Sequence, residues 1–294
     1  MDAVLATPTV PPHPAKKRPV LRGCEWVALA YFSYLPSLGL IRGISMEHLV
    51  VLACIPVALW VAWRAQSCSN DKSLEVLRDW WPLGLIPVGY WALEWFAAPP
   101  RGEMEVFLVR WDRFILHGAH FQTVVGVAGS FFPALLEMLY LFVYAMPPVC
   151  LAILYACGGR PQVPRFLLLL FAGTFATYAL LPFIRVISPR IAFPNSDLPP
   201  YSGIMRDLNT WVLDHLDIST SVLPSGHVAV ALSSALGMVD ALPQRPGLGR
   251  FALGMASLVY LATVYGRYHY AVDGLVSILV VSLIFQLLSR SSRA

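Results

Sequence analysis

The stretch Pro224-Ser225-Gly226-His227 begins one apolar run of this sequence, and Arg267-Tyr268-His269-Tyr270-Ala271-Val272-Asp273 begins another near its end. His269 and Asp273 are four residues apart, so a helix would bring the carboxylate beside the imidazole and let it hold the ring N–H. Ser225 stands where a helix would start, and the free N–H groups of a helix N-terminus attract an anion. Ionisable side chains are costly at membrane depth, so these two clusters indicate a functional site.

The composition of the chain is that of a membrane protein. Of its 294 residues, 57% are hydrophobic and only 13% are charged, and the mean hydropathy is +0.63. A bilayer-spanning helix needs about 20 residues, and the apolar runs approach that length or reach it with their flanks. We therefore predict an all-α fold, a polytopic membrane helix bundle of about eight spans, in residues 25–40, 48–63, 80–96, 132–157, 166–184, 228–242, 251–265 and 271–288.

The first 23 residues differ from the rest. They are rich in proline and carry Lys16, Lys17, Arg18 and Arg22. Such a segment cannot bury enough apolar surface to fold, so we predict that residues 1–23 are a disordered basic tail. Residues 24–294 then form a single membrane domain, and the basic tail places the N-terminus in the cytoplasm.

Threading eight spans from a cytoplasmic N-terminus sorts the charged residues by side. Each cytoplasmic connection then carries a basic pair or more, as the positive-inside rule expects. These residues are Arg64, Lys72, Arg78, Arg160, Arg165, Arg245, Arg250, Arg290 and Arg293. The same threading puts both histidine clusters at the opposite face, which is periplasmic, extracellular or luminal. This placement explains the net charge of +4, so nucleic acid is not an expected partner.

The two clusters resemble the second and third signature motifs of the type 2 phosphatidic acid phosphatase superfamily, whose sites are similar to those of vanadium haloperoxidases. The resemblance implies that His269 attacks phosphorus as the nucleophile, that Asp273 orients it and that His227 protonates the leaving group. It also implies a six-helix catalytic core, here about residues 111–288, with the earlier spans as N-terminal additions.

The resemblance is imperfect in the residues that would bind phosphate. The usual third motif has an arginine six residues before the histidine, where this chain has Thr263, and the nearest arginine is Arg267. The usual first motif is replaced by residues 178–182, Tyr-Ala-Leu-Leu-Pro, leading to Ser188-Pro189-Arg190. This replacement is similar to the branch that contains inositol phosphorylceramide synthases. The implied phosphate site consists of Arg190, Arg267, Arg185, Ser225 and Gly226.

Two other polar segments offer alternatives. His117 and His120, three residues apart within 101–123, could ligate a metal, but no cysteine or further histidine clusters near them. An interfacial helix used for packing or substrate entry is the favoured interpretation. The loop 185–223 directly precedes the Ser-Gly-His cluster and either shapes the headgroup pocket or is a solvated connector. We expect neither a metal nor a cofactor.

These observations predict a metal-independent membrane enzyme, a lipid-phosphate phosphatase that acts on a lipid phosphate or phospholipid through a phosphohistidine intermediate. The alternative is a phosphotransferase that moves a phospho-headgroup to a hydroxyl acceptor, as inositol phosphorylceramide synthases do. A non-catalytic lipid carrier or transporter is disfavoured, because both the nucleophile and the acid are present.

Overall fold

The structure, a computed structural model, describes residues 21–68, 71–96, 102–127, 129–184, 186–194, 202–218 and 222–291. Residues 1–20 of the expected basic tail and Arg185 of the expected phosphate site lie outside these ranges. Within them the chain forms helices joined by turns and extended segments, with no strand. The predicted all-α fold is therefore confirmed.

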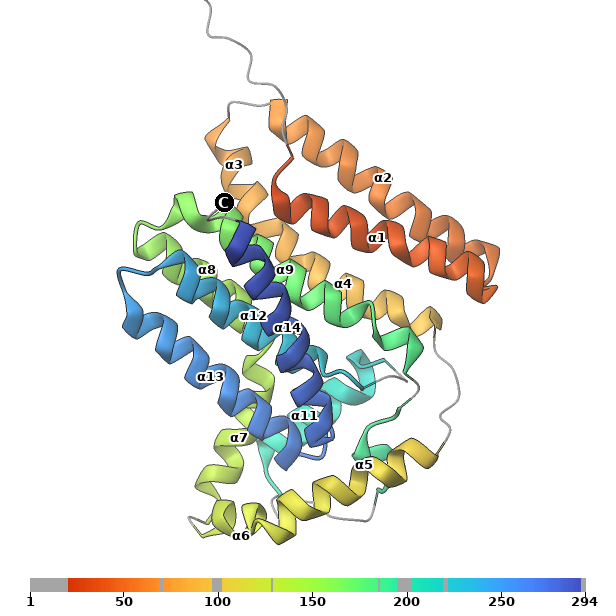
Figure 1. Cartoon of the computed structure of the whole chain (residues 1–294), viewed down its shortest axis with the longest axis vertical. Coiled ribbons are helices and arrows are strands. Elements are labelled where there is room, and N and C mark those ends of the chain that lie inside the picture. Colours follow the sequence, from red (N-terminus) through yellow and green to blue (C-terminus); the bar gives the residue numbers. More distant parts are fainter. Residues whose placement is uncertain are drawn as a thin grey trace, which may run out of the picture.

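The long helices run between two ends of a bundle (Figure 1). α1 (Gly23–Arg42) and α2 (Met46–Cys68) form a hairpin at one edge. α9 (Val163–Tyr178), α12 (Gly226–Ala241), α13 (Pro246–Tyr265) and α14 (Ala271–Ser291) pack together as the main body. α5 (Glu103–Arg113), α6 (Phe121–Gly126) and α11 (Ile204–Leu216) lie at the end where α12 and α14 begin. Both histidine motifs are thus at the same end.

The predicted count of eight spans is only partly supported. Five described helices are long and apolar enough to cross a bilayer: α1, α2, the Arg160–Phe183 segment around α9, α13 and α14. α7 (Phe131–Phe142) and α8 (Met146–Ala156) add a sixth if this pair, bent by 76°, is one span. α12 is apolar but has only 16 residues.

The expected span in residues 80–96 is broken into short helices. After α3 (Lys72–Trp80), the chain forms η1 (Trp81–Gly84), α4 (Leu85–Trp91) and η2 (Ala92–Phe96). Proline supplies no backbone N–H, and Pro82 and Pro87 fall within this stretch, so a continuous helix is disfavoured there. The other short elements are η3 (Phe114–Gly118), η4 (Arg160–Gln162), η5 (Leu181–Phe183) and α10 (Pro189–Ala192).

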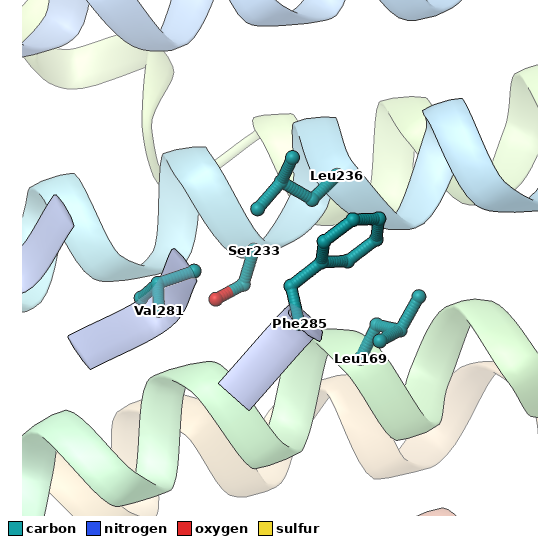
Figure 2. A pocket seen from close by; sticks show the side chains of 5 residues that line it. All are labelled: Leu169, Ser233, Leu236, Val281 and Phe285. Atoms are coloured by element: carbon teal, nitrogen blue, oxygen red, sulfur yellow. The ribbon is translucent and has the colours of Figure 1, made fainter. Parts of the chain in front are cut away.

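α9, α12 and α14 meet in a tightly packed seam, which Figure 2 shows from close by. Ser233 of α12 lies among Leu169 of α9 and Val281 and Phe285 of α14, and the gap that they line is too small for a water molecule. A Cβ at Gly173 would collide with Ser233 Oγ, so glycine is needed where α9 approaches. Small residues allow this close packing between membrane helices. The seam fixes α12 and α14, which carry the two motifs, relative to each other.

Ion pairs gather at the end of the bundle opposite to the histidine motifs. They join the start of α1, α3, the Arg160 turn before α9, α9 itself and the end of α12. The pairs are Arg22–Asp79, Arg78–Glu25, Arg160–Asp79 and Arg165–Asp240, with N–O distances from 2.5 to 3.3 Å. Arginines that the sequence assigned to the cytoplasmic connections therefore share one end of the bundle, away from the candidate site.

Candidate active site

His269 is held by acceptors on one side of its ring. Its Nδ1 lies 3.3 Å from Asp273 Oδ2 and 3.1 Å from the Val222 carbonyl oxygen. Asp273 sits in the first turn of α14 with no exposed surface, and its Oδ2 also accepts the Tyr270 N–H at 2.9 Å. Both neighbours of Nδ1 can only accept, so we assign its proton to Nδ1. The lone pair of neutral His269 is therefore on Nε2.

His227 faces that lone pair. Ser225 caps α12, its Oγ accepting the Val228 N–H at 3.3 Å, so His227 stands in the first turn of the helix. Its Nδ1 lies 3.2 Å from His269 Nε2, and its Nε2 lies 3.1 Å from the Tyr144 hydroxyl. Nδ1 of neutral His227 is then the donor to His269, and the Tyr144 hydroxyl donates to Nε2.

Backbone contacts also tie the two motifs together. The Ser225 N–H donates to the Asp273 carbonyl at 3.1 Å. The Ser277 hydroxyl lies 2.9 Å from both the Ser225 and the Asp273 carbonyl oxygens. The contacts between the motifs join residues up to 52 positions apart in the sequence, and they leave the two imidazoles facing each other.

Gly226 is explained by an aromatic neighbour. A Cβ at this position would lie 3.0 Å from Tyr178 Cε1, so a larger residue would press on that ring. Tyr178 belongs to the segment 178–182 that the sequence placed in the substitute first motif. Gly226 also lines the cavity described below.

Arg267 is buried in an ion pair. Its guanidinium is fully buried, and its Nη1 donates to Asp112 Oδ2 at 2.5 Å. Nε and the other amino nitrogen have no hydrogen-bond partner among the described residues, but the group is shielded from solvent, so binding phosphate would require a rearrangement. The expected role of Arg267 as a phosphate ligand is not supported by this geometry.

The Arg267–Asp112 pair instead shapes the turn that carries His269. Arg267 has a φ of 62°, in the left-handed region that non-glycine residues rarely adopt. Asp112 Oδ1 accepts the Ala271 N–H at 2.8 Å, at the start of α14. The Thr263 carbonyl accepts the N–H groups of Tyr268 and His269 at 3.0 and 3.1 Å. One carboxylate from α5 therefore binds the chain on both sides of His269.

Arg190 is the described arginine best placed to serve the site. Its N–H donates to the Arg267 carbonyl at 3.1 Å, which docks Ser188-Pro189-Arg190 onto the third motif. Its side chain is 21% exposed, and its guanidinium lies 3.5 Å from Asp214 Oδ1, a weak and exposed contact that an anion could replace. Arg185, the other arginine predicted from this segment, is outside the described residues.

Asp217 joins α11 to α4 near the histidines. Its Oδ1 accepts the Tyr90 hydroxyl at 2.5 Å. Burial raises the pKa of this carboxyl above its ordinary value, and the Tyr90 hydrogen bond, His269 and Arg190 act in the opposite direction. Asp217 is thus within electrostatic reach of both His269 and Arg190.

Several site residues were missed from the sequence. They include Tyr144, Tyr140 and Tyr90. Each lies inside an apolar run, where a tyrosine is interpreted as a packing residue. Tyr140 stacks on His227 with ring centroids 4.6 Å apart. The spacing of Tyr140 and Tyr144, one helical turn apart, is a signal that could have suggested a shared face.

The segment with His117 and His120 contains η3 and the start of α6, and both histidines are exposed. Within the described part of the chain, no three histidine, cysteine or acidic side chains come together as a potential metal site. Metal independence of the reaction stays a prediction.

A cavity of about 400 Å³ opens beside His227. Its walls come from η1 and α4, the turn between α7 and α8, the start of α8, Tyr178, α11 and the start of α12, and most of the lining side chains are apolar. Tyr144, Gly226 and His227 stand where the cavity meets the histidine pair. The arrangement thus places an apolar space next to the two facing imidazoles.

Searches of curated proteins and of solved structures found no match. A family model described as the PAP2 superfamily matches residues 107–287, more than half of the chain and the part that contains every histidine-site residue of α12 and α14. This match supports phosphatase-type or phosphotransferase-type chemistry on lipid phosphates. The chain belongs to the PAP2 superfamily.

Proposed function

We propose that this protein is an integral membrane lipid-phosphate phosphatase that works through a phosphohistidine on His269. The observation that carries the proposal is the pair of facing imidazoles, with His269 Nε2 3.2 Å from His227 Nδ1. Nδ1 of His269 contacts only hydrogen-bond acceptors, and Nε2 of His227 contacts the Tyr144 hydroxyl. A nucleophile and an acid need these two different settings.

In the first step, the phosphoryl group of the substrate lies between the His227 and His269 rings, which no longer contact each other directly. The Nε2 lone pair of His269 attacks phosphorus, and the bond from phosphorus to the ester oxygen breaks. The departing alkoxide takes a proton from the His227 imidazolium and leaves as an alcohol. Asp273 and the Val222 carbonyl stabilise the cation that forms on His269.

In the second step, water attacks the phosphohistidine. Neutral His227 takes a proton from the water, the P–N bond breaks and its electron pair returns to His269 Nε2. Inorganic phosphate leaves, and His227 is protonated again for the next cycle. Arg190 and the N–H groups at the start of α12 supply the positive charge that stabilises the phosphoryl oxygens in both steps.

The alternative is transfer of the phosphoryl-linked group to an organic hydroxyl. It draws support from the docking of Ser188-Pro189-Arg190 onto the Arg267 carbonyl, since this segment resembles the inositol phosphorylceramide synthase branch. In that reaction the acceptor hydroxyl takes the place of water in the second step, and the chemistry at His269 is unchanged.

We further propose that the site faces the periplasm, the extracellular space or the lumen, because the arginine-rich end of the bundle fits the cytoplasmic side. The test uses a variant in which the native cysteines are replaced. In that background, Ser202→Cys, next to α11, should react with a membrane-impermeant maleimide in intact cells. Gln244→Cys, in the connection between α12 and α13, should react only after permeabilisation. The reverse pattern would place the site in the cytoplasm.

The function is tested with purified protein in detergent and a panel of lipid phosphates and phospholipids, with and without hydroxyl acceptors. Release of inorganic phosphate identifies the phosphatase, and a new phospholipid that appears only with acceptor identifies the transferase. EDTA should leave turnover unchanged, and vanadate should inhibit because its adduct resembles the transition state. His269→Ala should abolish turnover, whereas His48→Ala, on α2, should not. Normal turnover by His269→Ala would remove the mechanism.

A further inference from the structure

The cavity beside His227 has one wall that the family region does not supply. The matched residues 107–287 provide Tyr144, Gly226, His227 and the apolar side chains around them. The opposite wall consists of Leu83, Ile86, Pro87, Tyr90 and Trp91, from η1 and α4. These five residues precede the matched region, so an N-terminal addition to the family core completes the space next to the acid histidine.

Hydrogen bonds hold this wall against both the N-terminal hairpin and the catalytic end. The Tyr90 hydroxyl donates to Asp217 Oδ1 at 2.5 Å, and Trp91 Nε1 donates to the Leu216 carbonyl at 2.8 Å. On the other side, the Gly89 carbonyl accepts the Tyr31 hydroxyl of α1 at 2.8 Å. The wall is therefore positioned by specific bonds and does not rest on apolar contact alone.

The chemistry of the cavity fits a hydrocarbon chain. Ile86, Val143 and Val230 are buried, so they offer apolar surface in a space shielded from water. Trp91 and Leu216, on the rim, are each 46% exposed, so the cavity reaches the surface of the helix bundle. The His227 ring also lines this space. A ligand with its phosphate between the histidines would place an attached chain along this space.

We propose that the segment 83–91 selects the apolar tail of the substrate, so that the N-terminal addition sets tail specificity while the family core performs the chemistry. This proposal rests on the function proposed above. It commits to one occupant, the hydrocarbon tail of the lipid phosphate. A tail of a bulk membrane lipid shares that chemistry, and the experiment below separates the two.

The first arm compares two substitutions on the same helix. Ile86→Phe narrows the cavity, and Val88→Phe, on an outward-facing position that is 39% exposed, is the matched control. Ile86→Phe should lower kcat/KM for a dioleoyl phosphatidate by about tenfold or more, the scale of a misfit in an apolar pocket. It should leave kcat/KM for a dihexanoyl phosphatidate within about twofold, and Val88→Phe should change neither. Equal losses on both substrates, or no loss on either, would overturn the proposal.

The second arm measures binding and needs no turnover. A lipid phosphate with a brominated tail should quench tryptophan fluorescence more in the parent protein than in Trp91→Phe, since Trp91 lines the cavity. An unbrominated lipid phosphate should reverse this difference, and a lipid without a phosphate should not. Reversal by both would assign the space to bulk lipid, and equal quenching in the two proteins would show that no tail binds there. Either result overturns tail selection.

The two arms also keep the two proposals apart. Failure of the parent protein to hydrolyse or transfer any lipid phosphate would remove the proposed function, whatever the quenching shows. Normal turnover with a tail preference that Ile86→Phe does not alter would remove tail selection and leave the function intact. Ile86→Ala serves if Ile86→Phe does not fold, and it should shift the preference toward bulkier tails.

Discussion

The two histidines of the site are bound in opposite ways. His269 is fixed at Nδ1 by a carboxylate and a carbonyl, which only accept hydrogen bonds. His227 lies between His269 and the Tyr144 hydroxyl, which can donate to a neutral ring or accept from a protonated one. The first setting allows one tautomer, and the second tolerates gain and loss of a proton. The contrast supports the proposal that His269 is the nucleophile and His227 the acid.

The largest effect is expected from breaking the fixed setting. Asp273→Asn keeps the size of the side chain but removes its charge and lets an amide N–H face Nδ1, so the His269 tautomer is no longer enforced. We expect kcat to fall by about 10³–10⁴-fold, the scale for neutralising the orienting carboxylate of a catalytic triad. Phosphate release under saturating substrate measures this. A loss below tenfold would show that the Val222 carbonyl alone sets the tautomer.

Removing the acid should have a substrate-dependent effect. His227→Ala should lower turnover of an alkyl phosphate by about 10²–10⁴-fold, because the alkoxide then leaves without a proton. The first step with p-nitrophenyl phosphate should be much less affected, since nitrophenolate is a stable leaving group. Burst measurements of nitrophenol and alcohol release test this. Equal losses in the first step for both leaving groups would contradict an acid role.

A smaller change tests the switchable setting. Tyr144→Phe removes the hydroxyl 3.1 Å from His227 Nε2 while keeping the ring in the cavity wall. We expect a loss of roughly 3–10-fold in kcat, the value of about one neutral hydrogen bond. We also expect a shift in the pH dependence of kcat, in the limb that reports the protonation of His227. Tyr155→Phe, at the opposite end of the bundle, is a control that should leave the profile in place. An unchanged profile in Tyr144→Phe would leave His227 without its proposed partner.

The smallest effect concerns stability around Asp217. Burial raises the pKa of this carboxyl above its ordinary value of 3.8. Ionising it costs the folded state more than the unfolded state, so folding loses stability as pH rises from about 4 through the raised pKa. Asp217→Asn can still accept the Tyr90 hydroxyl, so we expect its Tm in detergent to exceed that of the parent by a few degrees at pH 8. The difference should shrink toward pH 4. A variant that is less stable than the parent at pH 8 would show that the charge is needed.

The helices that carry the motifs were predictable from the sequence because short-range rules govern them. Asp273, in the first turn of α14, contacts the ring of His269 four residues earlier, although His269 itself precedes the helix, and Ser225 caps α12 as its position before an apolar run indicated. The partners at long range were not predictable. Asp112 and Arg267 form an ion pair although they are 155 positions apart in the sequence. No local pattern in the sequence indicates this pairing.

The helix breaks were also hard to predict, for a related reason. Apolar composition gives the length of a hydrophobic run but does not show where its helix bends or breaks. Residues 132–157 were therefore predicted as one span. In the structure, α7 and α8 meet at 76°, and the break at residues 143–145 puts Tyr144 against His227. Similarly, the broken helix at residues 80–96 brings Tyr90 to Asp217. Both helix breaks therefore place a tyrosine, Tyr144 or Tyr90, in contact with a residue of the site.

Trapping the phosphoenzyme tests the central claim most directly. In His227→Ala, p-nitrophenyl phosphate should still phosphorylate the enzyme, but the second step lacks its base, so the intermediate should accumulate. After an alkaline quench, which preserves phosphohistidine, mass spectrometry of the peptides should find one phosphoryl group on His269 that decays slowly on removal of substrate. Nitrophenol release with no phosphoryl group on the protein, or with the group on another residue, would contradict the account.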